Sequence, residues 1–245
     1  MGEIQHRCQA TGRTRHRPVS SSATPETAPS GAGRPFIPAR RSPIAWVLLI
    51  GILLLGLAVD LGTKQWSFEH IADTPVVLDR TAIIENANLN PIPPHDSVVL
   101  IPGRILNMHL VLNPGAVFGI GAEQRTFFVI FTILAVTACM LAFTLWMSAD
   151  SRLAHIGLAL VLAGALGNLW DRVLYGRVRD FLHMLPDRHL PFGWSWPGGN
   201  SELFPWIFNI ADVMLLAGMG LLLIHLQLSD RRIAKQNRER VDGES

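Results

Sequence analysis

Charged side chains are scarce in this sequence. Of its 245 residues only 16% are Asp, Glu, Lys or Arg, whereas 49% are hydrophobic and the mean hydropathy is +0.29. A water-soluble domain normally carries about a quarter charged residues. Because the shortage is concentrated in four apolar stretches, the sequence predicts an integral membrane protein.

Other features are also missing, and each absence removes a class of function. The net charge of +2 is too small for a nucleic-acid-binding protein. Cys8 lies in a polar tail and Cys139 in an apolar run, so a disulfide between them is not expected. Neither a G-x-S-x-G nor an H-E-x-x-H motif is present. The lysines, Lys64 and Lys235, offer no suitable partner for a membrane Ser–Lys peptidase.

Four apolar stretches remain, and we interpret each as a membrane-spanning helix. They cover residues 44–59, 126–147, 153–170 and 206–228. Each is close to the length needed to cross a hydrocarbon core of about 30 Å. The first is expected to end at Asp60, where the charge interrupts the apolar run.

Polar tails flank this membrane domain of residues 44–228. Residues 1–43 are rich in Ser, Pro, Thr, Gly and Arg, which predicts a disordered basic tail without the apolar core of a signal peptide. Residues 229–245 form a second basic tail. Basic residues favour the cytoplasmic side, so both termini are expected in the cytoplasm, although the connection after the third span also carries arginines.

Two longer connections are then expected outside. Residues 62–125 contain the apolar runs 98–101 and 108–112, which are bounded by Pro-Gly pairs and typical of strands in a small sheet. Residues 182–205 are rich in Pro, Gly and Trp, and indole rings prefer the headgroup level, so this loop is expected at the membrane interface. The expected fold is therefore an all-α membrane protein with four transmembrane helices and a small extracytoplasmic sheet.

Carboxylates stand where the apolar stretches meet these outer connections. Acidic groups at membrane depth are costly and usually functional. The topology brings Asp60, Asp171, Asp180, Asn209 and Asp212 to one outer face, although they are spread over 150 residues of sequence. The sequence therefore predicts a polar site at that face.

Two close aspartates in a site of low dielectric constant cannot both ionise easily. One keeps a proton and serves as an acid while the other serves as a base, which is the chemistry of peptide hydrolysis. The alternative is that each carboxylate is solvated or paired with Arg172, Arg177 or Arg179. Asp212, in the first turn of the last helix, would also be favoured by the helix dipole.

The neighbouring polar residues also have two interpretations. Asn168 and Asn209 hold the aspartates or a substrate backbone, or they simply join helices by hydrogen bonds. Residues 113–118 contact substrate or form a plain turn. Asp60 and Lys64, four residues apart, support the site or form a local ion pair.

The same sequence also allows functions other than peptide hydrolysis. His183, Asp187 and His189 are weak metal candidates in a proline-containing loop, and no metal is expected. A small transporter that relays protons would spread its polar residues through the bilayer depth. A lipid-binding scaffold would tolerate loss of Asp180 and Asp212.

Four motifs, taken in order, closely resemble lipoprotein signal peptidase, the bacterial type II signal peptidase. Asp-Leu-Gly-Thr-Lys from residue 60 is similar to the family's Asp-x-x-Thr-Lys, and Asn-Pro-Gly-Ala-Val-Phe from residue 113 to its Asn-x-Gly-Ala-x-Phe. Residues 167–181 match Gly-Asn-x-x-Asp-Arg-x-x-x-Gly-x-Val-x-Asp-Phe, and residues 208–212 match Phe-Asn-x-Ala-Asp. The resemblance covers residues 44–228. The stretch between Asp180 and Asp212 is longer than in the family pattern.

The resemblance implies an aspartyl endopeptidase of the bacterial inner membrane, with Asp180 and Asp212 as its catalytic dyad near the outer face. It implies prolipoprotein substrates cut just before a diacylglyceryl-modified cysteine, phospholipid surroundings and no metal or organic cofactor, and we expect a monomer. Matching residue by residue, it also implies supporting or substrate-binding roles for Asp60, Lys64, Asn113, Gly115, Asn168, Asp171, Arg172 and Asn209.

Overall fold

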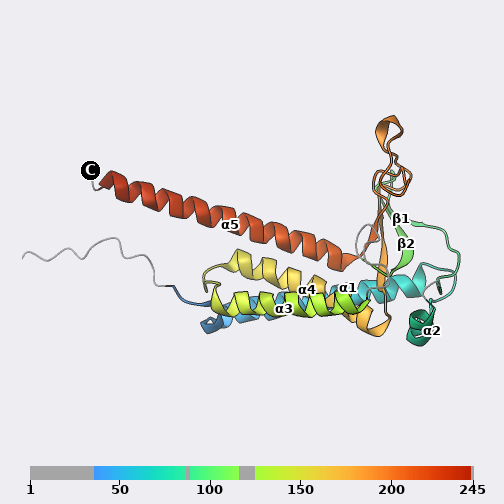
Figure 1. Ribbon diagram of the computed structural model, residues 1–245, viewed down its shortest axis with the longest axis horizontal. Coiled ribbons are helices and arrows are strands. Elements are labelled where there is room, and N and C mark those ends of the chain that lie inside the picture. The colour runs from blue at the N-terminus through green and yellow to red at the C-terminus, as the bar shows by residue number, and fades with distance from the viewer. Residues whose placement is uncertain (1–35, 87–88, 116–124, 244–245) are drawn as a thin grey trace, which may run out of the picture. The chain divides into compact units, whose positions relative to one another are not determined.

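Four long apolar helices dominate the computed structural model, which describes residues 36–86, 89–115 and 125–243. They are α1 (Pro43–His70), α3 (Arg125–Leu145), α4 (Arg152–Leu174) and α5 (Ile210–Gly243), each long and apolar enough to cross a membrane (Figure 1). The four predicted spans are thereby confirmed. The expectations for residues 1–35 and for Ala116, Val117 and Phe118 concern parts of the chain outside the described residues.

The prediction that the first helix ends at Asp60 is wrong, because α1 continues for ten more residues. Lys64 lies one turn further along and its Nζ is 2.8 Å from Asp60 Oδ2, with both side chains fully buried. The Asp60 charge is therefore compensated within the helix and does not end it. At the other end, the hydroxyl oxygen of Ser42 caps α1 by accepting a hydrogen bond from the Ala45 amide.

α5 differs from its predicted span at both ends. It begins at Ile210 rather than at residue 206, and it continues beyond residue 228 to Gly243. A helix of 34 residues is about 51 Å long, which exceeds the roughly 30 Å of a hydrocarbon core. Its last turns therefore extend past the apolar part that can lie in lipid.

α4 is the central helix of the four. In its most apolar window 56% of the residues are buried, against 17% or less in the other three helices. Small residues let its neighbour approach closely, as a Cβ on Gly164 would lie 2.3 Å from the carbonyl oxygen of Ala211. Gly164 therefore allows close packing of α4 against α5.

A four-stranded antiparallel sheet lies at one end of the helices (Figure 1). Its order is β1 (Val98–Ile101), β2 (Leu106–Asn113), β3 (Val178–Met184) and β4 (Ile207–Phe208). β1 and β2 confirm the two predicted strands, whereas β3 and β4 were not predicted. The sheet packs on the end of α1 through a core that includes Phe68, Met108 and Phe181. Nearby, the short helix α2 (Arg80–Glu85) is capped by Asp79.

Residues 185–206, here called the outer hairpin, connect β3 to β4. The predicted loop at 182–205 corresponds to this hairpin, except that residues 182–184 belong to β3. The Leu190 amide donates to the carbonyl of Ser201, and His189 pairs with Glu202 in an isolated bridge. Because β4 leads directly into Asn209 and α5, the hairpin joins the sheet to the start of the last membrane helix.

Candidate active site

Asp180 lies on β3 and not at the end of a helix. Val111 of β2 is its cross-strand partner, and its side chain is 2% exposed. Asp212 lies in the first turn of α5, where it forms a capping box with Asn209. The Asn209 amide donates to Asp212 Oδ2 over 3.1 Å, and the Asp212 amide donates to Asn209 Oδ1 over 3.2 Å. The sequence Asn-Ile-Ala-Asp thus starts the helix and fixes the carboxylate in one step.

Two asparagines link the carboxylates to each other. Asn209 Nδ2 donates to Asp180 Oδ1 over 2.6 Å and to Asn168 Oδ1 over 3.0 Å. Asn168 Nδ2 donates in turn to Asp212 Oδ1 over 2.9 Å. The resulting chain runs from Asp180 through Asn209 and Asn168 to Asp212 and joins β3, α5 and α4. Both asparagines therefore serve the carboxylates as well as helix packing.

Asp180 accepts a second amide hydrogen bond from the sheet. Asn113 Nδ2, at the end of β2, donates to Asp180 Oδ2 over 3.0 Å. Asn113 Oδ1 accepts a hydrogen bond from the Gly115 amide, which closes the turn after the strand. Neutral amide groups thus occupy both oxygens of Asp180. Among the residues that the structure describes, neither Asp180 nor Asp212 forms an ion pair, so the predicted alternative of arginine pairing is wrong.

The orientation of the Asn168 amide is fixed by Lys64. The ammonium group of Lys64 can only donate hydrogen bonds, and its Nζ donates to Asn168 Oδ1 over 3.0 Å. Because Oδ1 must face Lys64, Nδ2 is the atom left to face Asp212. The predicted ion pair of Lys64 with Asp60 is confirmed, and through Asn168 it also acts on the site.

Lys64 belongs to a buried network of four charged side chains. Its Nζ lies 3.3 Å from Asp171 Oδ2, and Asp171 Oδ1 accepts a hydrogen bond from Arg179 Nη2 over 2.8 Å. The second acid, Asp60, accepts a hydrogen bond from the Ala211 amide and so satisfies a free N–H of the first turn of α5. Two positive and two negative charges, all at most 3% exposed, thereby compensate one another.

Sequence reasoning missed the structural role of Arg179. Its backbone amide also donates to Asp171 Oδ2, so both its main chain and its side chain tie β3 to the end of α4. Successive side chains on a strand point to opposite faces, so Arg179 and Asp180 face different surroundings. Once residues 178–184 are recognised as a strand, this alternation predicts that Arg179 and Asp180 have different roles.

Arg172 holds the turn beside the site rather than a carboxylate. Its Nη2 donates to the carbonyl of Gly115 over 3.1 Å, and its Nη1 donates to the carbonyl of Asn168. The guanidinium group lies 5.0 Å from the centre of the Phe128 ring. Arg172 therefore connects the β2 turn to α4 and to α3.

Burial raises the pKa of the Asp180 carboxyl to about 7, and the nearby charge of Asp212 adds to this increase. The hydrogen bonds from Asn113 and Asn209 favour the ionised form and limit the increase. A carboxyl group with such a pKa exchanges its proton at neutral pH. This is the property that a general acid or base needs.

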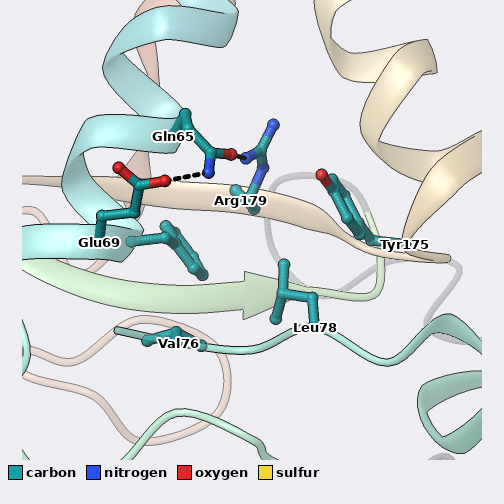
Figure 2. Close-up of a pocket in the computed structure, with 7 residues that line it drawn as sticks. Gln65, Glu69, Val76, Leu78, Tyr175 and Arg179 are labelled. Carbon is teal, nitrogen blue, oxygen red and sulfur yellow. Dashed lines mark hydrogen bonds between the residues drawn. The ribbon is translucent and has the colours of Figure 1, made fainter. Parts of the chain in front are cut away.

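A small polar pocket lies on the other side of β3 and is distinct from the carboxylate pair. Figure 2 shows Arg179 donating to Gln65, which donates to Glu69, beside the ring of Tyr175. The guanidinium group lies 4.7 Å from the centre of that ring. The pocket is lined by Gln65, Phe68, Glu69, Val76, Leu78, Tyr175 and Arg179. Neither Asp180 nor Asp212 lines this pocket. It lies on the face of β3 that carries Arg179.

The weak metal candidates do not come together. His183 Nε2 lies 3.5 Å from Glu202 Oε2, and His189 Nδ1 lies 3.1 Å from the hydroxyl of Ser201. Within residues 36–86, 89–115 and 125–243, no group of three His, Cys, Asp or Glu side chains is placed to hold a metal ion.

Comparisons with known proteins identify the family of this chain. The family model described as signal peptidase (SPase) II matches residues 52–228. A lipoprotein signal peptidase from Anaeromyxobacter is 31% identical over 202 residues, which cover 76% of this chain and 88% of that protein. One from Symbiobacterium thermophilum is 37% identical over 138 residues, covering 56% and 80%.

A solved structure described as a bacterial membrane enzyme is also similar. It is 30% identical, has a TM-score of 0.51 and is matched over 74% of this chain and 88% of its own. The helices, the sheet and the ordered motifs therefore lead to one conclusion: the chain belongs to the signal peptidase II family of multi-pass membrane proteases.

Proposed function

We propose that this chain is an aspartic endopeptidase that removes signal peptides from prolipoproteins, cutting just before a diacylglyceryl-modified cysteine. Asp180 and Asp212 are its catalytic residues. The observation that carries the proposal is the hydrogen-bonded chain from Asp180 through Asn209 and Asn168 to Asp212. It links the buried Asp180 to the half-buried Asp212, and within the described part of the chain neither carboxyl group has a cationic partner.

The raised pKa of Asp180 favours a mechanism in which Asp180 starts protonated and Asp212 acts as the base. Asp212 takes a proton from water, and the hydroxide oxygen bonds to the scissile carbonyl carbon while Asp180 gives its proton to the carbonyl oxygen. Asp212 then protonates the leaving nitrogen and the C–N bond breaks. Asp180 recovers its proton from the new hydroxyl group as the carbonyl re-forms, which restores the starting state.

The surrounding residues have four tasks in this proposal. Asn168 and Asn209 orient the two carboxylates, and the turn at Asn113 and Gly115 contacts the substrate backbone. Arg172 holds that turn through its bond to the Gly115 carbonyl. The buried charged residues keep the asparagines in position, and they are Asp60, Lys64, Asp171 and Arg179.

We place the site at the outer face of the bacterial cytoplasmic membrane, with both termini in the cytoplasm and residues 44–228 as a monomeric peptidase domain among phospholipids. The basic residues that precede α1 and end α5 support this orientation. The transporter alternative expected polar groups throughout the bilayer depth. Among the described spans, the buried charged side chains instead lie around one end of the helices, beside the sheet.

A cleavage assay with purified protein in lipid tests the proposal. Lipid-modified precursor should be cut, and unmodified precursor should be cut far more slowly. If Asp180→Asn or Asp212→Asn retains full cleavage, the dyad is wrong. Equal processing of both precursors would leave a membrane peptidase but remove its specificity for lipoproteins.

A further inference from the structure

The outer hairpin ends in an exposed aromatic tip that the proposed chemistry does not use. Residues 190–201 form this tip and contain no charged side chain. Phe192 is 90% exposed and Trp194 is 66% exposed, and their rings lie 6.1 Å apart. Two large aromatic side chains without charged neighbours are unusual at the end of a projecting hairpin in water, because their exposure to solvent is unfavourable.

The backbone at the tip holds Phe192 in a sparsely populated conformation. Its φ is 61°, in the left-handed region that bulky residues rarely adopt, and Gly193 follows with a φ of 74°. The Trp194 amide donates to the carbonyl of Pro191 and closes this turn. Strain of this kind persists where the surrounding structure imposes it and often marks a functional segment. Here it accompanies a ring that faces away from the protein.

The hairpin is stiff between its tip and the active site. The Trp196 amide donates to the carbonyl of Asn200, and the Trp196 indole donates to the carbonyl of Glu202. Aromatic rings continue from there to β4, with centroid separations of 4.8–5.9 Å, along Trp196, Trp206, Phe204 and Phe208. Phe208 directly precedes Asn209, so this row of rings connects the tip to the capping box of Asp212.

The hairpin extends across the direction of the membrane helices and not along it (Figure 1). It leaves the sheet at the end of the helices where α5 begins, which is the level at which the apolar part of α5 starts. An arm that crosses the helix direction at this level runs along the membrane surface. Aromatic side chains, and Trp above all, favour the boundary between headgroups and acyl chains.

We propose that the outer hairpin is a membrane anchor whose tip inserts Phe192 and Trp194 into the lipid leaflet on the active-site side. The partner is the headgroup–acyl boundary of the bilayer. The uncharged tip, the exposed rings and the continuity with the membrane helices all fit lipid. The inference rests on the membrane-spanning helices and not on the catalytic roles of Asp180 and Asp212.

Depth-dependent fluorescence quenching tests the anchor. Full-length protein with Cys8→Ser and Cys139→Ala receives one cysteine, as Phe192→Cys or Trp194→Cys, and is labelled with bimane. The labelled protein is placed in nanodiscs of phosphatidylethanolamine and phosphatidylglycerol, with or without nitroxide-labelled lipid. A matched label at Glu239→Cys reports an exposed position near the far end of α5, beyond its apolar part.

Lipid nitroxides should quench the labels at 192 and 194 at least about twice as strongly as the label at 239, because the tip lies at the headgroup level. Aqueous iodide should show the opposite order. Equal lipid quenching at all three positions would overturn the anchor. Protection from both quenchers would also overturn it, since the tip would then be covered by protein.

The same measurement separates this inference from the proposed function. Adding Asp180→Asn to the labelled protein should leave lipid quenching at 192 unchanged, whether or not Asp180 is catalytic. The double variant Phe192→Ser/Trp194→Ser provides the functional readout. It should raise the KM for lipid-modified precursor in nanodiscs more than in detergent micelles, and an equal change in both would contradict anchoring in a bilayer.

Discussion

The charged side chains on the two faces of β3 have different kinds of partner. On one face, Arg179 meets Asp171 in an ion pair that Lys64 and Asp60 extend into a balanced group of four charges. On the other face, Asp180 is held by Asn113 and Asn209, which are neutral. Adjacent residues of one strand thus have surroundings that differ in kind.

The difference shows what each face is suited to do. Opposite charges at hydrogen-bonding distance attract one another directly, so the contacts on the Arg179 face tie α1, α4 and β3 together. Amide donors orient a carboxylate without removing the cost of its charge. The Asp180 face therefore keeps a proton that can leave at neutral pH, as the raised pKa of about 7 indicates. One face of β3 thus stabilises the fold, and the opposite face carries the carboxyl group that can react.

The largest expected effect comes from removing charge on the Asp180 face. Asp180→Asn and Asp212→Asn should each reduce the rate of precursor cleavage roughly a thousandfold or more, because the acid or the base is lost. Thermal unfolding should still show a cooperative folded protein. The measurement is the single-turnover cleavage rate of a lipid-modified precursor.

Asp187→Asn is the matched control for these variants. Asp187 is an exposed carboxylate on the outer hairpin, and its left-handed φ of 59° suits Asn equally well. Its cleavage rate should equal that of the unmodified protein. A comparable loss in all three variants would show that the reduction is not specific to the dyad.

Removing a charge on the Arg179 face should instead affect stability. Lys64→Met leaves Asp60 and Asp171 without their shared cation, which should cost about 3–5 kcal/mol of unfolding free energy. The cleavage rate should fall only because less of the protein is folded and because Asn168 is no longer held in its orientation. Thermal unfolding in detergent measures the first effect.

Lys235→Met is the comparison for Lys64→Met. Lys235 lies 3.7 Å from Glu239 in an ion pair whose side chains are mostly exposed, and such pairs contribute little to stability. The midpoint of thermal unfolding should remain where it was. If Lys64→Met leaves the unfolding midpoint equally unchanged, the buried charges do not hold α1, α4 and β3 together.

A smaller effect is expected where α4 passes the charge network. A Cβ on Gly167 would lie 2.2 Å from Asp60 Oδ2, so Gly167→Ala pushes the ion pair of Asp60 and Lys64 apart. Overpacking of this kind costs about 1–3 kcal/mol. Gly62→Ala, whose Cβ would have no neighbour within 4 Å, should be neutral or slightly stabilising in α1. Unfolding midpoints of the two variants decide the comparison.

The sequence is informative where one physical requirement acts alone. Long apolar runs predict α1, α3, α4 and α5, because a membrane-crossing helix must present apolar side chains along its whole length. Short apolar runs between Pro-Gly pairs predict β1 and β2 in the same way. The expected topology of the four spans predicts that five polar residues lie at one face, and the hydrogen bonds and ion pairs of the structure connect them: Asp60, Asp171, Asp180, Asn209 and Asp212.

β3 was not predictable because both of its faces are buried and each carries a mixture of polar and apolar side chains. Its sequence, Val-Arg-Asp-Phe-Leu-His-Met, alternates neither in charge nor in hydropathy, so it lacks the pattern of a half-exposed strand. The predicted end of the first helix at Asp60 was wrong for a related reason. A lone Asp predicts the end of a membrane helix, and only the contacts of Lys64 show that the charge is compensated inside it. Pairing between distant segments is the information that local patterns do not contain.

The smallest expected effect tests how the neutral face sets the pKa of Asp180. The Asn113 amide stabilises the ionised carboxylate, so Asn113→Ala should raise the pKa of Asp180 above about 7, by up to about one unit or 1.4 kcal/mol. In the proposed mechanism Asp180 must start protonated, so cleavage declines as pH rises through this pKa. The declining limb of the pH–rate profile should therefore move to higher pH in the variant, even if the loosened turn lowers the maximal rate. Asn107→Ala, on the same strand, should leave the limb unmoved. A rising limb that shifts upward instead would make Asp180 the base and exchange the roles of the two aspartates.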